Sequence, residues 1–294
     1  MSTEKIYKNF VFLVNQIVNT ALSILKVIVQ SKYNNQLPKA KKLNCIVLAN
    51  GPSLKQSLEK NLNHFIETPL ICVNTFALTD EFVKLKPTYY IMLDPFFWEK
   101  KNETVIDTFS SLALKTTWCL YLFIPKHALN KEVFINLKNK NNNIHIVPFN
   151  YTVFKGFPTI AHWFYRKNLA MPQSLNVTIA ALFIGINIGF KEIKLVGADH
   201  TWHENLHMSN ENVLHSKVPH FYENEVEVKY VPFYKGGHVE KGTQKAHEFF
   251  NIWSRTFYAY ILINEYAISR NCTIYNASEI SFIDAFKRCS ITNS

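Results

Sequence analysis

The feature that most constrains the fold is a short apolar run at residues 45–49 that ends in Asn50-Gly51-Pro52-Ser53. A run of this kind, closed by Gly and Pro, is typical of a strand buried on both faces of a parallel sheet. Open α/β sheets bind ligands at the edge where such strands end. Ser53 is placed to start the next helix as its N-cap, with free N–H groups behind it that suit an anion. The run therefore predicts an α/β fold with a nucleotide site beside this turn.

The chain from residue 43 onward alternates between strand-like and helix-like segments. Strands are expected at 43–49, 70–74, 88–93, 117–123, 144–148, 192–197 and 272–275. Helices are expected at 53–65, 76–84, 126–139, 176–188 and 244–270. Continuous apolar strands separated by amphipathic helices predict a Rossmann-like, mainly parallel sheet with helices on both faces. Residues 200–240 have little periodicity and are expected to form a long lid loop, so that residues 43–294 make one α/β domain.

Residues 10–30 predict an apolar helix that precedes this domain. The stretch is long enough to span a membrane, but polar residues recur along it at a spacing of three and four, namely Gln16, Asn19, Ser23, Lys26 and Gln30. A polar stripe favours an amphipathic helix that lies in the membrane interface or packs on a partner, including a second copy of the chain, over a true span. Packing of the helix on the main domain is an equal alternative. Residues 34–42 read as a linker, which sets a boundary at residue 42.

Charge and cysteine usage narrow the class of protein. The first 42 residues hold seven lysines and one glutamate, a surplus of +6 within the net +10 of the chain. Basic charge beside an apolar helix fits an anionic membrane surface, and no Arg-rich stripe or aromatic RNA-binding signature points to nucleic acid. Five scattered cysteines without a C-x-x-C spacing indicate reduced thiols in a cytoplasmic protein. We therefore expect a cytoplasmic protein peripherally associated with the inner membrane surface.

Polar residues follow four of the expected strands. They are Asn50, Asn74, Asp94 and Asp199, each at the point where an apolar run stops. Turn chemistry alone explains any one of them. Because the carboxyl ends of parallel strands face one edge, the four are expected to converge on a single crevice that suits a nucleotide.

An ordered set of motifs resembles bacterial sialyltransferases that use CMP-sialic acid. The set comprises Asn-Gly-Pro-Ser-Leu at 50–54, Cys-x-Asn at 72–74, Gly-Phe-Lys-Glu-Ile-x-Leu-x-Gly-x-Asp at 189–199, Gly-His at 237–238 and Lys-Ala-His-Glu-Phe at 245–249. The likeness covers roughly residues 43–285. The Asn-Gly-Pro-Ser turn also occurs in a related group, the motility-accessory-factor and hydroxymethylpterin-diphosphokinase-like proteins.

The resemblance implies an inverting transfer of a sugar acid from its CMP-activated form to a hydroxyl of a surface glycan or glycolipid, as in lipopolysaccharide or capsule biosynthesis. It implies that no metal or other cofactor takes part. It places Asn50 and Asn74 on the cytidine nucleotide and makes His238 the general base, a role that suits the unperturbed histidine pKa of about 6.5. Tyrosine hydroxyls would steady the leaving phosphate, and the candidates are Tyr222, Tyr230 and Tyr234.

This chain departs from that pattern at the donor site. Asp94 stands where the family has Asn, Asn176 and Thr178 stand within its Thr-Ser-Gly motif, and Ser174 replaces an Arg. Asn176 and Thr178 still offer polar groups at a helix N-terminus to phosphate or ribose. The missing Arg leaves a nonulosonic acid or a Kdo-type sugar open as donor. The full set of expected nucleotide- and donor-binding residues is Asn50, Gly51, Ser53, Asn74, Asp94, Asn176, Thr178, Asp199, Tyr222, Tyr230 and Tyr234.

Three other interpretations remain open from the residues. His203 and His207 lie four apart beside Asp199, a spacing that can ligate zinc or manganese, although the signal is weak. Asp94 and Asp199 can equally serve Mg²⁺ in a diphosphokinase-like enzyme that uses ATP and a pterin. The third alternative is a non-catalytic scaffold that binds nucleotide or lipid without turnover.

Overall fold

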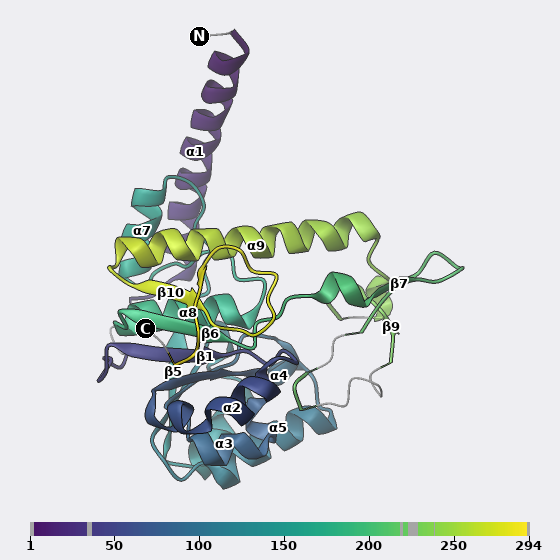
Figure 1. Cartoon of the computed structure of the whole chain (residues 1–294). Helices are drawn as coiled ribbons and strands as arrows, with labels where there is room; N and C mark the ends of the chain where they lie inside the picture. Colours follow the sequence, from purple (N-terminus) through teal and green to yellow (C-terminus); the bar gives the residue numbers. More distant parts are fainter. Residues whose placement is uncertain (1–2, 34–36, 218–219, 223–228, 238, 293–294) are drawn as a thin grey trace.

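The computed structural model describes residues 3–33, 37–217, 220–222, 229–237 and 239–292. Its centre is an eight-stranded parallel sheet in the order β11-β10-β6-β1-β2-β3-β4-β5 (Figure 1). The strands are β1 (Asn44–Leu48), β2 (Leu70–Val73), β3 (Tyr89–Ile91), β4 (Leu120–Pro125), β5 (Ile144–Phe149), β6 (Glu192–Val196), β10 (Thr273–Asn276) and β11 (Lys287–Arg288). The chain runs outward from β1 to β5 and then returns to β6 on the other side of β1. This reversal creates the crevice at which α/β sheets bind ligands.

Helices cover both faces of the sheet (Figure 1). One layer contains α2 (Leu54–Glu67), α3 (Asp80–Leu85), α4 (Phe96–Glu99), α5 (Glu103–Lys115) and α6 (Glu132–Lys140). The other contains α7 (Pro158–Arg166), α8 (Val177–Ile188) and α9 (Ala246–Ser269). Both layers bury apolar side chains against the strands, so the expected fold class is confirmed.

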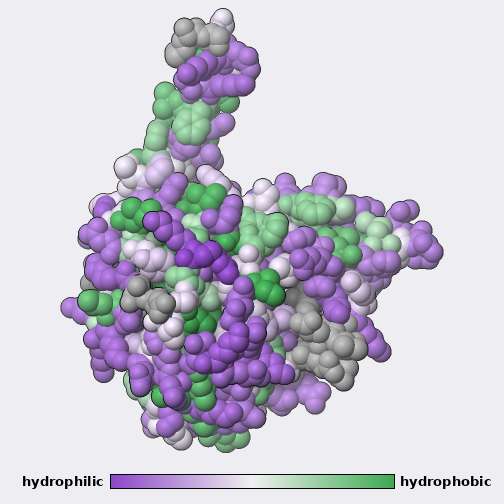
Figure 2. All heavy atoms as spheres, viewed as in Figure 1, coloured by the Kyte–Doolittle hydropathy of each residue, from purple (hydrophilic) through white to green (hydrophobic). Residues whose placement is uncertain are grey.

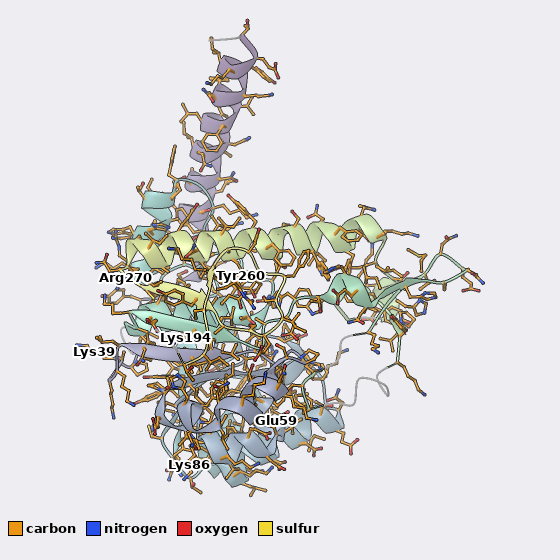
Figure 3. The ribbon with its side chains drawn as sticks, viewed as in Figure 1. Lys39, Glu59, Lys86, Lys194, Tyr260 and Arg270 are labelled. Carbon is orange, nitrogen blue, oxygen red and sulfur yellow. The ribbon has the colours of Figure 1, made fainter. Side chains whose placement is uncertain are left out.

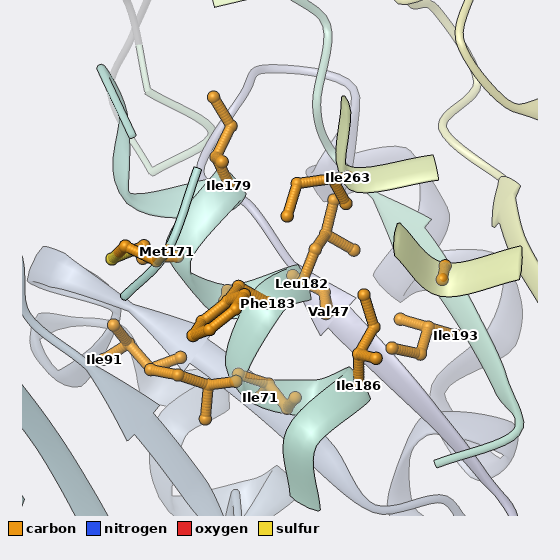
Figure 4. Close-up of a cluster of buried hydrophobic side chains, with 14 of the residues drawn as sticks. Val47, Ile71, Ile91, Met171, Ile179, Leu182, Phe183, Ile186, Ile193 and Ile263 are labelled. Atoms are coloured by element: carbon orange, nitrogen blue, oxygen red, sulfur yellow. The ribbon is translucent and has the colours of Figure 1, made fainter. Parts of the chain in front are cut away.

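The core on the α8 side explains why that helix is apolar all round. Ten of its residues are buried, because it is held between the sheet and α9. Figure 4 shows Leu182 and Phe183 of α8 among Val47 and Ile71 of the sheet and Ile263 of α9. The helix ends at Gly189, whose φ of 112° is a left-handed C-cap conformation that glycine adopts without strain.

All seven expected strands are present, whereas three helices and one strand of the large sheet, β11, were not expected. Asn102 caps α5 through its side-chain oxygen, which accepts from the N–H of Val105 at 3.0 Å. The β-branched residues after that cap obscured the helical period. Proline and aromatic residues did the same in α7, and α4 is only one turn long. The edge strand β11 has just two residues, and the buried amine of Lys194 on β6 donates to the carbonyl of Ile291 at 3.0 Å beyond it (Figure 3).

The N-terminal helix α1 (Thr3–Gln30) begins seven residues before the expected start and leaves the domain as an isolated rod (Figure 1). Its second half packs on the segment between β5 and α7. The Ser23 hydroxyl donates to the carbonyl of Lys155 at 2.9 Å, and the Thr20 hydroxyl accepts from the N–H of Phe157 at 3.0 Å. Part of the expected polar stripe therefore faces the protein itself instead of water.

The segment expected to be one long loop carries a small antiparallel sheet. Its strands are β7 (Leu206–Met208), β8 (Leu214–Ser216) and β9 (Val231–Pro232), in the order β7-β8-β9. Trp202 and Phe233 pack from this segment onto Phe249 and Trp253 of α9. Strands this short have too few residues for alternation to be recognised in the sequence.

All five cysteines are free thiols. Cys45, Cys72 and Cys272 are buried, as expected of core thiols, whereas Cys119 is exposed.

Candidate functional site

A pocket of about 580 Å³ opens at the carboxyl ends of the strands. Turns after β1, β2, β3, β5 and β6 supply one wall. The start of α8, the N-terminal part of α9 and seven residues between them supply the rest, namely His200, Thr201, Trp202, Asn205, Ser216, His220 and Phe233. Seven of the residues expected from the sequence line it, namely Asn50, Gly51, Asn74, Asp94, Asn176, Thr178 and Asp199. The expected convergence of the four strand-end side chains on one crevice is therefore present in the structure.

The turns after β1 and β6 interlock at the pocket floor. The N–H of Gly51 donates to the carbonyl of Gly197 at 2.8 Å. A β-carbon at Gly51 would lie 2.5 Å from that carbonyl, and one at Gly197 would lie 2.7 Å from the carbonyl of Ala49. Gly197 also has a φ of 71°. Both glycines are therefore needed because two backbones approach each other without side chains between them.

We expect Gly51→Ala to destabilise the fold by about 1–3 kcal/mol, because the added methyl group forces the two turns apart. The change would appear as a lower urea midpoint of unfolding with an unchanged m-value. An unchanged midpoint would mean that the turns separate without cost and that the glycine serves only the ligand.

The side chain of Asp199, which follows β6, lies at the start of α2. Its carboxylate accepts from the N–H of Ser53 at 2.8 Å and from the Ser53 hydroxyl. Ser53 holds the N-cap position of α2, as expected, but its backbone angles are helical and its side chain makes no capping hydrogen bond. The N–H groups of Leu54 and Lys55 bond to carbonyls of the turn. A carboxylate of the protein thus takes the place of the anion expected here, and Ser53 contacts the site only through Asp199.

Two amide oxygens in the pocket wall lack a protein partner. Asn50 donates its Nδ2 to the carbonyl of Val73 at 3.2 Å, which leaves its Oδ1 free to accept. The Oδ1 atoms of Asn50 and Asn74 are both buried and have no hydrogen-bond partner within the described residues. Asn74 has a φ of 50°, in the left-handed region, and the Tyr90 hydroxyl donates to its carbonyl. Buried polar atoms are seldom left unpaired without a reason, so these two oxygens fit a ligand that carries hydrogen-bond donors.

A polar network stands behind the start of α8. Asn176 caps this helix, because its Oδ1 accepts from the N–H of Ile179 at 3.1 Å. Its Nδ2 lies 3.0 Å from both the Nε2 of His200 and the hydroxyl of Tyr260, and that hydroxyl lies 2.7 Å from the same Nε2 (Figure 3). Both neighbours can donate, so Nε2 accepts and the ring proton belongs on Nδ1. Burial lowers the pKa of His200 to about 3, which keeps the ring neutral at pH 7.

The side chains of Asn176 and Thr178 therefore form hydrogen bonds within the protein, whereas from the sequence they were expected to contact the ligand. Thr178 is buried and lies close enough to the Tyr260 hydroxyl to hydrogen-bond to it. What α8 offers to the pocket is its backbone, because the first N–H groups of a helix have no partner within it. Val177 and Thr178, the first two residues of α8, both line the pocket.

Asp94 and Tyr151 form the rim on the β3 and β5 side. Asp94 is exposed, and its Oδ1 accepts from the N–H of Phe96 at 2.9 Å. One carboxylate oxygen of Asp94 therefore stabilises the turn after β3, as turn chemistry alone would explain. Burial, and then the charge of Asp94, raise the pKa of Tyr151. The Tyr151 hydroxyl donates to the carbonyl of Ser174. Tyr151 was not among the residues expected at the site.

The opposite end of the pocket is aromatic and was not expected. Trp202 stacks on His200, with ring centroids 4.3 Å apart, and contacts Trp253 at 5.1 Å. Phe233 and Phe249 line the same end. Four of these rings come from two segments far apart in the sequence, and no local spacing signals their meeting. The pocket thus joins a polar half at the sheet edge to an aromatic half under α9.

The three loop tyrosines expected at the phosphate do not line this pocket in the described structure. The Tyr222 hydroxyl lies 2.5 Å from that of Thr75, and its ring stacks on His220, which does line the pocket. Tyr230 contacts the ring of His207, and Tyr234 pairs with Thr243 in a β-bridge. These tyrosines brace the loop segment, because its own short strands give it little internal support.

His238, the expected general base, lies outside the described residues. Its surroundings are anchored to α9. Lys235 forms an ion pair of 2.7 Å with Glu248, whose other oxygen accepts from the N–H of Lys245 at 2.8 Å. The Lys-Ala-His-Glu-Phe motif is therefore the start of α9, and its Phe249 reaches the pocket.

The histidines of the metal interpretation point to different neighbours. His203 packs on Phe282 with ring centroids 4.4 Å apart, and His207 faces His215 at 6.3 Å. Over the part of the chain that the structure describes, no three side chains of His, Cys, Asp and Glu gather as metal ligands. The i, i+4 spacing fails because residues 202–208 form a 3₁₀ turn followed by a strand instead of an α-helix.

Comparison with known proteins gives a family and a fold. The model of the family "6-hydroxymethylpterin diphosphokinase MptE-like" matches residues 19–205, more than half of the chain. A search of curated proteins gives no match. The structure is similar to that of the MAf glycosyltransferase from Magnetospirillum magneticum AMB-1, with a TM-score of 0.50 and 12% sequence identity over 96% of this chain. The match spans 39% of that longer protein, and at this identity the likeness concerns the fold. By the extent of the family match, this chain belongs to the 6-hydroxymethylpterin diphosphokinase MptE-like family.

Proposed function

We propose that this protein is an inverting glycosyltransferase that moves a sialic-acid-like sugar, of the nonulosonic or Kdo type, from its CMP-activated donor to a hydroxyl of a cell-surface glycan. The observation that carries the proposal is that the amide oxygens of Asn50 and Asn74, at the carboxyl edge of a parallel sheet, have no hydrogen-bond partner among the described residues. The fold shared with a glycosyltransferase and the ordered motifs support it.

The polar half of the pocket suits the nucleotide. Asn50 and Asn74 accept hydrogen bonds, and the exocyclic amine of cytosine and the ribose hydroxyls are the donors that CMP offers. The N–H groups of Val177 and Thr178 at the start of α8 suit the phosphate, because a helix N-terminus carries a partial positive charge. No metal is required in this arrangement, since backbone groups of the protein stabilise the leaving phosphate.

The reaction needs one base and one leaving group. The base removes the proton from the acceptor hydroxyl, whose oxygen forms a bond to the anomeric carbon as the bond to CMP breaks. CMP leaves with the electron pair on the opposite face of the sugar, which inverts the configuration. His238 is proposed as the base, on the strength of the Gly-His motif and of the anchoring of its neighbours Lys235 and Lys245 to Glu248 beside the pocket.

Donor recognition must differ from that of the sialyltransferases. Ser174 is buried, and its hydroxyl donates to the carbonyl of Asn176 at 2.8 Å, so it replaces neither the charge nor the reach of an Arg. The carboxylate of the donor then depends on the same helix N-terminus as the phosphate. This is the reason to keep donors such as CMP-Kdo and CMP-pseudaminate beside CMP-sialic acid.

We expect CMP to raise the unfolding temperature selectively in a panel with CDP, UDP, GDP and ATP, with or without EDTA. A ligand at a hundred times its Kd stabilises by about 2.7 kcal/mol. Asn50→Ala or Asn74→Ala should raise the Kd for CMP by about tenfold, the worth of one hydrogen bond. Asn139→Ala on α6, an exposed amide of the opposite layer, is the matched control.

A diphosphokinase-like enzyme that uses ATP, Mg²⁺ and a pterin is the second candidate, favoured by the family description. Mg²⁺ is usually held by one or two carboxylates together with substrate phosphates. Asp94 lines the pocket with one oxygen engaged, while both oxygens of Asp199 accept from Ser53. Stabilisation by ATP with metal, and none by CMP, would favour this enzyme. Binding of nucleotide without any turnover would favour the scaffold interpretation.

A further inference from the structure

The strongest unexplained surface is the outer face formed by α1 and α9. The free half of α1, residues 3–19, extends for about 25 Å at about 1.5 Å per residue. Among its residues, only Gln16 is partly buried. One face of it is apolar and carries Phe10, Leu13 and Ile17 at exposures of 63, 48 and 53%, whereas Lys5, Lys8, Gln16 and Asn19 lie on the other face. An apolar face of this length left open to water marks a surface that contacts a membrane or a partner.

The helix α9 carries a second apolar surface on the same side. Phe250, Tyr258, Ile261 and Ile268 are exposed and recur at helical spacing along one face of α9, with Ser254 and Glu265 between them. In Figure 1, α9 runs along the top of the domain and α1 rises away from it. Figure 2 shows hydrophobic atoms over both α1 and the arm formed by α9. The helix α7, which carries the exposed Ile160 and Trp163, lies beside the base of α1 (Figure 1).

Three basic residues lie close to the packed half of α1. They are Lys26 within it, Lys32 just after it and Lys155 in the segment on which it packs. Arg166 and Lys167 stand at the end of the adjacent α7. This positive charge complements an anionic surface. Tryptophan beside lysine and arginine is typical of the interface between membrane and water.

We propose that α1, the outer stripe of α9 and Trp163 together form a docking face for an anionic lipid bilayer. The helix α1 enters the apolar layer along its own axis, while α9 and Trp163 rest in the headgroup region. This differs from the flat amphipathic helix expected from the sequence, because the polar side chains Thr20 and Ser23 contact the protein. Of the helices that the structure describes, α1 has the length and composition for such insertion.

This attachment fixes the pocket relative to the membrane. The N–H of Lys32 donates to the Oδ1 of Asn150 at 3.1 Å, and the Nδ2 of Asn150 donates back to the carbonyl of Lys32 at 2.7 Å. The Ser31 hydroxyl donates to that of Thr152 at 2.7 Å. Tyr151, between these two contacts, lines the pocket. The end of the anchor is therefore joined directly to the wall of the pocket.

Flotation of the full-length protein with lipid vesicles tests the docking face. We expect the protein to float with phosphatidylcholine vesicles that contain phosphatidylglycerol and to float less with pure phosphatidylcholine. Leu13→Asp combined with Ile17→Asp should lower the floated fraction at least tenfold. Leu114→Asp on α5, where the side chain is 82% exposed on the opposite layer, should leave it unchanged. All three side chains are about half exposed or more, so an unchanged unfolding midpoint will show that the variants fold.

A fluorescent label tests the mode of insertion. Leu13→Cys is labelled with an environment-sensitive dye in a Cys119→Ser background, which removes the exposed native thiol. A blue shift on addition of anionic vesicles supports entry of α1 into the apolar layer. A label that stays in water, or a Leu13/Ile17 variant that floats as well as the wild type, would overturn the proposal. A stable oligomer that does not bind vesicles would also overturn it and would make a second copy of the chain the partner of α1. None of these results depends on the reaction at the pocket.

Discussion

Replacing His238 with alanine should lower kcat by about 10²–10⁴-fold while leaving the Kd for CMP unchanged. A general base acts on the acceptor hydroxyl in the transition state, and a well-placed one contributes about this factor. In the proposed site the donor nucleotide is held by Asn50, Asn74 and the start of α8, which the substitution does not touch. Release of CMP in the presence of acceptor measures the rate, and thermal shift with CMP measures the binding. The acidic limb of the pH profile of kcat/KM should disappear with the imidazole.

His247→Ala is the matched control for this substitution. His247 belongs to the same segment and is exposed on the first turn of α9. Full activity of His238→Ala would show that the Gly-His motif does not supply the base. His220 would then be the next residue to replace, because it lines the pocket and its ring stacks on Tyr222.

The sheet was predictable because its strands are buried on both faces. Such strands are uninterrupted apolar runs closed by turn residues, and both features are local. The helices α5 and α7 were missed where β-branched and aromatic residues blur the helical period, although the cap of α5 at Asn102 was a usable signal. The strands at 206–208, 214–216 and 231–232 have only two or three residues each, too few for an alternating pattern to be recognised.

The site was predictable to the extent that it consists of strand ends. Asn50, Asn74, Asp94 and Asp199 meet because parallel strands end at one edge of a sheet. The roles of these residues were not predictable in the same way. The carboxylate of Asp199 lies at Ser53, far away in the sequence, and fills the anion position that the start of α2 seemed from local rules to offer. The aromatic half depends on the packing of α9, which is a property of the folded chain as a whole.

His200 provides the clearest prediction about stability. Its pKa is lowered by burial to about 3 in the folded protein, against about 6.5 in the unfolded chain. Between these values the unfolded chain binds a proton that the folded protein does not bind. The free energy of unfolding contributed by the neutral ring is therefore complete above pH 6.5 and is lost as the pH falls toward 3. The loss amounts to about 1.4 kcal/mol per pH unit and to several kcal/mol over the whole range.

The variant His200→Asn should remove this part of the acid sensitivity. Asparagine tolerates the left-handed backbone of residue 200, where φ is 54°, and carries no titratable group. The variant will be less stable at pH 7, because Tyr260 and Asn176 lose the acceptor between them. The informative quantity is the slope of the free energy of unfolding against pH, so urea unfolding is measured at several pH values from about 7.5 to about 4.5.

The difference in stability between wild type and variant should shrink by about 1.4 kcal/mol per pH unit below 6.5. The pKa values of His127 and His162 are also lowered by burial, but both residues are present in each protein and cancel in that difference. His145→Asn, at an exposed position of β5, should keep the slope of the wild type. Equal slopes for wild type and His200→Asn would mean that His200 takes up a proton without unfolding, which would require the network of Asn176 and Tyr260 to turn and accept it.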